Sequence, residues 1–131
     1  AVNSLNGARV NASNSLFEND WEGISFNTFN QGNPSVITGC TFRTTAAGLI
    51  SPKNLLQKMD VGIEILNCSN LIIGPSTNNP SLANTFDNVS NGVHITNSAT
   101  IIVQYNFFRN ILYSTTQVDP TTSYTTGNAV K

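Results

Sequence analysis

An internal repeat limits what this chain can fold into more than any other feature of its sequence. Three segments begin with glycine and then alternate apolar with polar residues: Gly23–Phe26, Gly62–Ile65 and Gly92–Ile95. Alternation with a period of two is typical of short strands with one buried face. We therefore expect equivalent strands from successive repeats to lie side by side.

Two further elements recur between these segments. One is a phenylalanine followed two residues later by a small polar residue, and it is found at Phe17, Phe42, Phe86 and Phe108. The other is an aliphatic patch, and it is found at 36–37, 71–73 and 101–103. Each repeat therefore predicts three short strands separated by polar corners.

The spacing of the phenylalanines gives the length of a coil. The first two are 25 residues apart and the last two are 22 apart, which suits one turn of three short strands. The middle interval of 44 residues contains either two turns or one turn with two insertions. We favour insertions near 46–60 and 74–83, because they bring Gly62 to the position that the repeat predicts. Within the first insertion, 51–59 could form a short helix.

These elements predict an all-β solenoid of about four coils over residues 1–111. The segment 112–131 lacks the repeat residues, so we expect a degenerate coil, a cap or a linker there. Strands of successive coils would stack at about 4.8 Å, which superposes like residues in columns. Asparagine tolerates the left-handed backbone of a bend, and its amide both donates and accepts hydrogen bonds. Ladders at the corners are expected from Asn19, Asn67, Asn88, Asn97 and Asn110.

One repeat is specific enough to resemble a known superfamily. Gly92–Asn97, Ile101–Val103 and Asn106–Asn110 combine a glycine-led strand, an aliphatic strand and an Asn-x-Phe-x-Asn strand. Over about 9–111 the chain resembles the right-handed parallel β-helix superfamily of pectate-lyase-like folds, in particular repeat-rich secreted bacterial surface proteins and carbohydrate-active members. The resemblance implies a right-handed parallel β-helix with an extracellular or bacterial cell-surface location. It implies no single function, because this architecture carries enzymes, adhesins and passive stalks alike.

Composition argues against two classes of partner. The formal net charge is −1, so the chain has no broad cationic field to attract nucleic acid or an anionic membrane surface. No stretch approaches the roughly 20 continuous apolar residues that a membrane-spanning helix requires. We therefore expect neither nucleic-acid binding nor membrane insertion.

Acidic side chains do not form the cluster that the resemblance implies for an enzyme. Enzymes of this superfamily use grouped aspartates, either for Ca²⁺ or as paired catalytic acids. Here only Glu18, Asp20 and Glu22 lie close together in sequence, and a solvated strand end is the favoured interpretation over a weak cation site. We predict no catalytic residue, no metal site and no cofactor.

His94 is the best single candidate for acid–base chemistry. The register places it in an outward column with Glu64 and Ser25, and these three groups are the components of a proton relay. A flat outward column faces water without a pocket, so we favour an exposed pair of small energetic value.

A second outward column lies one residue after each phenylalanine. Its members alternate in charge: Glu18, Arg43, Asp87 and Arg109. Opposite charges across neighbouring strands help to fix register. The functional alternative is a clamp of Arg43 and Arg109 on an anionic sugar, which is disfavoured because Asp87 would lie between them.

Trp21, with Phe29, Tyr105 and Tyr113, is one of the aromatic residues most able to reach the surface and contact a sugar. A flat ring can stack on a sugar, and Glu18 and Asp20 could line the same groove. Packing under a loop is the alternative for such a residue. The ligand-binding candidates are thus Glu18, Asp20, Trp21, Arg43, Glu64, His94 and Arg109. The two cysteines, Cys40 and Cys68, fall in different columns, which disfavours a disulfide.

We expect a non-catalytic structural or adhesive module of a secreted or cell-surface protein. The terminal coils would expose unpaired backbone, so we expect a fragment or subunit that continues into or docks on further β-helix coils. One alternative is a carbohydrate-binding or polysaccharide-degrading protein, either a lyase or a hydrolase. The other is an accessory subunit of a larger extracellular complex. Its partners would be a polysaccharide or other protein subunits.

Overall fold

The computed structural model describes residues 1–5, 7–28, 30–45, 61–111 and 128–130. These residues form an all-β structure of short strands, with one 3-10 turn, η2 (Pro80–Leu82). The short helix predicted over 51–59 and the insertion predicted near 46–60 lie outside the described residues.

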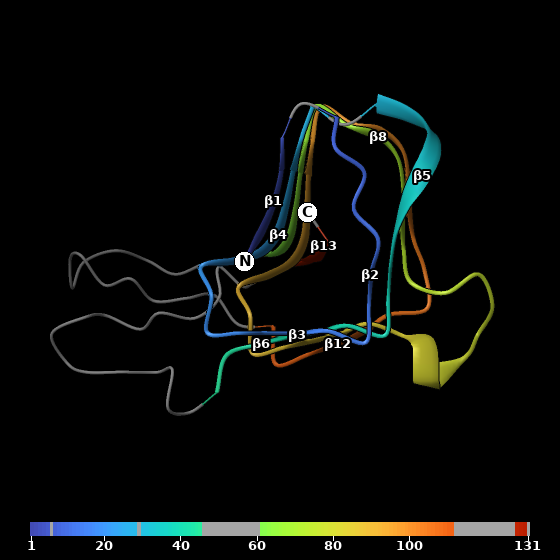
Figure 1. Cartoon of the computed structure of the whole chain (residues 1–131). Helices are drawn as coiled ribbons and strands as arrows, with labels where there is room; N and C mark the ends of the chain where they lie inside the picture. Colours follow the sequence, from blue (N-terminus) through green and yellow to red (C-terminus); the bar gives the residue numbers. More distant parts are fainter. Residues whose placement is uncertain (6, 29, 46–60, 112–127, 131) are drawn as a thin grey trace, which may run out of the picture.

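The strands form three sheets, in which every pairing is parallel (Figure 1). Sheet A contains β1 (Val2–Leu5), β4 (Glu22–Asn27), β7 (Val61–Leu66), β10 (Asn91–Thr96) and β13 (Asn128–Val130). Sheet B contains β2 (Ala12–Ser13), β5 (Asn30–Thr38), β8 (Ser69–Ile73) and β11 (Ala99–Val103). Sheet C contains β3 (Leu16–Glu18), β6 (Thr41–Arg43), β9 (Thr85–Asp87) and β12 (Phe107–Arg109).

The chain visits the three sheets in strict rotation, which gives the structure a solenoid-like character. Each strand pairs with the strand three elements later, so β4 pairs directly with β7 and β6 with β9. The 44-residue interval between the second and third phenylalanines is therefore one step along sheet C. Part of that interval is an excursion between β8 and β9 that contains η2.

The register superposes the residues that the repeat predicted to be equivalent. In sheet A, Ile24 pairs with Ile63, which pairs with Val93. The aliphatic patches align in sheet B, where Ile37 pairs with Ile73, and Ile73 with Val103. Inward side chains from all three sheets form one buried cluster. Like residues thus fill the core in columns, as the sequence predicted.

The four repeated phenylalanines form a continuous stack along the inner face of sheet C. Ring centroids are 4.8, 4.9 and 4.8 Å apart from Phe17 through Phe42 and Phe86 to Phe108, and successive planes differ by 6 to 8°. Because this spacing matches the separation of neighbouring strands, the rings stay in contact without any shift of the backbone. The predicted phenylalanine column is confirmed.

The repeated glycines are explained by this stack. A Cβ atom on Gly62 would lie 2.6 Å from a ring carbon of Phe86 and 2.7 Å from the Gly92 carbonyl oxygen. A Cβ atom on Gly23 or Gly92 would likewise lie 2.5 Å from a ring carbon of Phe42 or Phe108. Any side chain larger than hydrogen would collide with the core here, so the phenylalanine and glycine signatures are one packing feature.

The corner asparagines adopt the left-handed backbone that was predicted for them. Their φ angles lie between 47° and 57° at Asn19, Asn67, Asn88, Asn97 and Asn110. A ladder of asparagine side chains is buried at a different corner, between sheets B and C. There the Asn84 side chain donates to the Ile37 carbonyl at 2.8 Å and to Asn106 Oδ1 at 2.9 Å, and it accepts from the Cys40 amide at 2.9 Å.

Both cysteines are buried free thiols, as their separate columns indicated. Cys40 lies at the corner before sheet C and Cys68 at the corner before sheet B. Each thiol donates to a carbonyl two residues earlier, at 3.4 Å for Cys40 and 2.9 Å for Cys68. Burial raises the pKa of the Cys40 thiol, and a backbone hydrogen bond with Ser15 opposes that shift.

Candidate functional site

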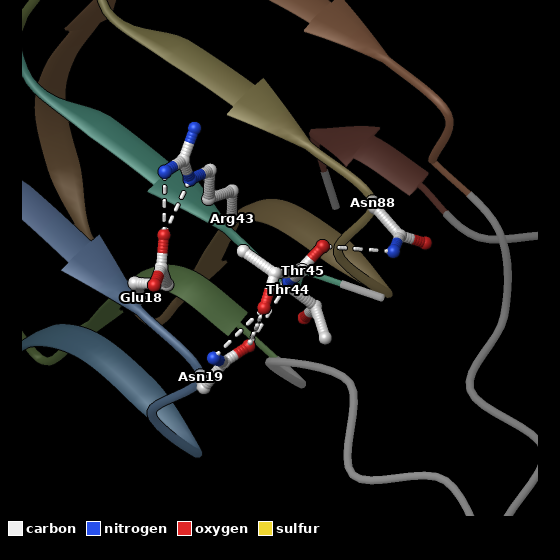
Figure 2. A network of polar contacts seen from close by, with 6 residues as sticks. All are labelled: Glu18, Asn19, Arg43, Thr44, Thr45 and Asn88. Atoms are coloured by element: carbon white, nitrogen blue, oxygen red, sulfur yellow. Dashed lines mark hydrogen bonds and ion pairs between the residues drawn. The ribbon is translucent and has the colours of Figure 1, made fainter. Parts of the chain in front are cut away.

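The charged column on the outer face of sheet C forms as the sequence predicted. Glu18 pairs in register with Arg43, Arg43 with Asp87, and Asp87 with Arg109. Figure 2 shows the Arg43 guanidinium directed at Glu18, whose Oε2 lies 2.6 Å from both Nε and Nη2. Arg109 Nε lies 3.1 Å from Asp87 Oδ2. Both ion pairs join neighbouring coils, so they help to fix the strand register.

The corner beside this column is also held by contacts between coils (Figure 2). Asn19 Oδ1 accepts from the Thr45 amide at 3.0 Å, and the Asn88 side chain donates to the Thr44 carbonyl at 2.9 Å. Asn110 donates to Asp87 Oδ1 at 2.8 Å. In these contacts the asparagine side chains bond to threonine or aspartate of an adjacent coil rather than to one another, as the predicted ladder would require.

The two arginines proposed as an anion clamp lie on strands separated by β9. Asp87 occupies the intervening position, where it forms an ion pair with Arg109 and accepts a hydrogen bond from Asn110. Glu18 neutralises Arg43 and Asp87 neutralises Arg109, and the Asp87 carboxylate between the two guanidinium groups repels a second anion. The charges of this column thus suit the fixing of strand register better than the binding of an anion.

His94, Glu64 and Ser25 share one outward column of sheet A, as predicted. Glu64 lies between the other two, with Oε1 3.7 Å from His94 Nδ1 and Oε2 3.5 Å from the Ser25 hydroxyl. The His94 side chain has 29% of its surface accessible to solvent, and the Glu64 side chain has 19%. A general base must contact the hydroxyl that it deprotonates, and here the carboxylate separates the imidazole from that hydroxyl.

Trp21 lies exposed at the corner that enters sheet A, with 57% of its surface accessible. The two acids predicted to share a groove with it have other partners. Glu18 pairs with Arg43, and Asp20 Oδ2 lies 3.2 Å from the N-terminal ammonium group of Ala1. The exposed indole can still contact a flat ligand, but neither acid is directed to it by these contacts.

The described residues contain neither a candidate metal site nor a candidate membrane-spanning helix. Over that part of the chain, no group of three or more His, Cys, Asp and Glu side chains could hold a metal ion. In the same residues, no helix has the length and apolar character needed to cross a membrane.

A hollow that sequence reasoning missed lies where the chain enters sheet B. It has a volume of about 590 Å³ and is lined by Gly7, Arg9, Gly32 and Asn33. The last two belong to a bulge in β5, where residues 31–34 face the single residue Asn70 of β8. The signal available in the sequence was the turn-forming run Gly32-Asn33-Pro34 before the aliphatic patch.

Comparison with protein-family models, with curated proteins and with solved structures finds no match for this chain. Its functional assignment therefore rests on its own residues and their geometry.

Proposed function

We propose that the chain is part of a right-handed parallel β-helix, of the kind found in repeat-rich secreted bacterial surface proteins, and serves as a non-catalytic structural or adhesive module. The handedness follows the general rule for parallel strands joined by crossover connections. An extracellular or cell-surface location belongs to the same proposal. So does continuation into, or docking on, further coils.

One observation carries this proposal. The ionisable side chains of the outward columns are matched across coils, as Glu18 with Arg43, Asp87 with Arg109 and Glu64 with His94. Groups that serve catalysis converge on a cleft where a substrate can reach them. Here the charges are instead paired along two sheet surfaces, which suits a module whose task is to keep its shape.

A turnover assay on a panel of acidic and neutral polysaccharides tests the non-catalytic role. The purified chain is incubated with each glycan, and new reducing ends and unsaturated products are measured. We expect none above a heat-denatured control. Turnover that is lost in His94→Gln would contradict the proposal and establish a role for the imidazole.

Binding of neutral or acidic carbohydrate through Trp21 is the second candidate function. The observation that favours it is the exposed indole, since an aromatic face stacks well on a sugar ring. Retention on insoluble polysaccharides should then be lost in Trp21→Ala and kept in Tyr105→Ala, a variant of another exposed aromatic. Equal retention of both variants would reject this candidate.

A further inference from the structure

The hollow at the start of β5 is built by residues that the solenoid repeat does not require. Four residues of β5 (31–34) stand opposite one residue of β8, so the strand bulges away from the regular ladder. Bulges are frequent beside functional sites because they redirect the backbone. The extra residues thus form a local feature that the neighbouring coils lack.

Two side chains from adjacent coils hold the bulge in place. Arg9, which precedes β2, donates from Nε to the Pro34 carbonyl at 3.0 Å. From the opposite side, the Asn70 side chain donates to the Gly32 carbonyl at 2.9 Å. Two carbonyl groups of the bulge are therefore hydrogen-bonded to side chains of neighbouring coils.

Arg9 differs from the other two arginines of the described residues in its partners. Arg43 and Arg109 each pair with a carboxylate, whereas the contact of Arg9 in this part of the chain is a neutral backbone carbonyl. Guanidinium has five N–H donors, and Nε supplies only one of them. Four donors on the two terminal nitrogens remain, in the arrangement that binds two oxygens of one anion.

The remaining lining residues favour a small anion. None of them is acidic, so no side chain of the lining repels negative charge. A Cβ atom on Gly32 would meet nothing within 4 Å, which shows that the backbone here faces open space. The exposed Asn33 amide can donate to a ligand oxygen or accept from a ligand hydroxyl.

We infer that this hollow is a binding subsite for an oxoanion group, with the terminal nitrogens of Arg9 as its main donors. Carboxylate, sulfate and phosphate share the required pair of oxygens. The inference is independent of the proposed structural or adhesive role, because it concerns residues outside the paired columns.

A nuclear magnetic resonance titration tests the subsite. The full chain is titrated with sodium acetate, sulfate or phosphate at constant ionic strength, with sodium chloride as the reference salt. We expect saturable shifts at the Gly7 and Gly32 amides and at Arg9 Nε–H. A response to acetate alone identifies a carboxylate, and a response to sulfate or phosphate identifies a tetrahedral anion.

Three variants separate the subsite from general charge effects. Arg9→Gln should weaken binding about tenfold, because it removes the charged donors. Gly32→Val keeps Arg9 but fills the hollow, and should also weaken binding several-fold. Arg109→Gln removes the same charge from an arginine that already has a carboxylate partner, and should leave binding unchanged. Equal shifts with chloride, or undiminished binding in both Arg9→Gln and Gly32→Val, would overturn the inference.

Discussion

Sheets B and C belong to the same coils but differ in regularity. Each strand of sheet C has three residues, with phenylalanine inward at every level and an unbroken register. In sheet B, β5 has nine residues and bulges against β8. The inward column of sheet B also changes from Ser35 to Leu71 and Ile101.

The comparison separates the residues that pack the core from those that do not. Phenylalanine at the inward position of every strand makes the inner face of sheet C a continuous packing surface, because each ring supports the next and excludes a side chain at the adjoining glycine. The bulge of sheet B lies outside that packing and leaves Arg9 and Gly32 beside open space. The inferred anion subsite and the phenylalanine stack thus lie on different sheets.

The largest expected effect comes from breaking the ring stack. Phe42 is fully buried between two stacked rings, so Phe42→Ala should lower the free energy of unfolding by about 3–5 kcal/mol. Urea denaturation measures this loss. Phe107→Ala, in the same sheet but 50% exposed, should cost less than about 1 kcal/mol. Similar losses in the two variants would contradict the assignment of Phe42 to the core.

Removal of the buried amide ladder should have the next largest effect. Asn84→Ala leaves the buried Cys40 amide without its acceptor, whereas the Ile37 carbonyl keeps a hydrogen bond from the Gly74 amide, so the cost should be about 1–3 kcal/mol. Asn33→Ala, in the exposed bulge of sheet B, is the matched control and should change stability by less than about 0.5 kcal/mol. An Asn84→Ala chain as stable as the unmodified protein would reject the ladder.

A pair of glycine variants compares the phenylalanine stack of sheet C, against which Gly62 of sheet A packs, with the bulge of sheet B. Gly62→Ala forces a Cβ atom against the Phe86 ring, and overpacking of this kind should cost about 1–3 kcal/mol. Gly32→Ala should leave the free energy of unfolding within about 0.5 kcal/mol of the original, because its Cβ atom meets nothing within 4 Å. Thermal and urea unfolding of both variants check the difference, and the reverse order would refute it.

The smallest effect concerns the charged column. A double-mutant cycle with Glu18→Gln and Arg43→Gln should give a coupling of about 0.2–1 kcal/mol, because both side chains are partly exposed. The coupling should fall in 1 M salt, where charges are screened over about 3 Å. A coupling that does not depend on salt would show that packing, not charge, joins the two residues.

The regular part of this structure was predictable from the sequence, and the irregular part was not. The phenylalanine spacing identified the strands and columns of sheet C, and the left-handed corners followed from asparagine. The edge strands Val2–Leu5 and Asn128–Val130 carry no repeat residue, so no pattern marked them.

The residues of the candidate site also divide into those that the sequence predicted and those that it did not. The columns of His94 and of Glu18 followed from strand register, because parallel strands superpose equivalent positions. The hollow at Arg9 depends on a bulge that Asn70 holds from another coil, and such a contact has no periodic signal in the sequence. The glycine and phenylalanine motifs were both visible in the sequence. Only the packing shows that each phenylalanine ring fills the space that a side chain on the adjoining glycine would need.

The central claim is that equivalent side chains superpose along the axis of parallel coils. The most direct test is a set of nuclear Overhauser effects in a deuterated sample with protonated phenylalanine rings. We predict ring-to-ring contacts from Phe42 to both Phe17 and Phe86, although these residues are 25 and 44 positions apart in the sequence. Absence of those contacts, or the close Hα–Hα pairs of antiparallel strands between β7 and β10, would contradict the account.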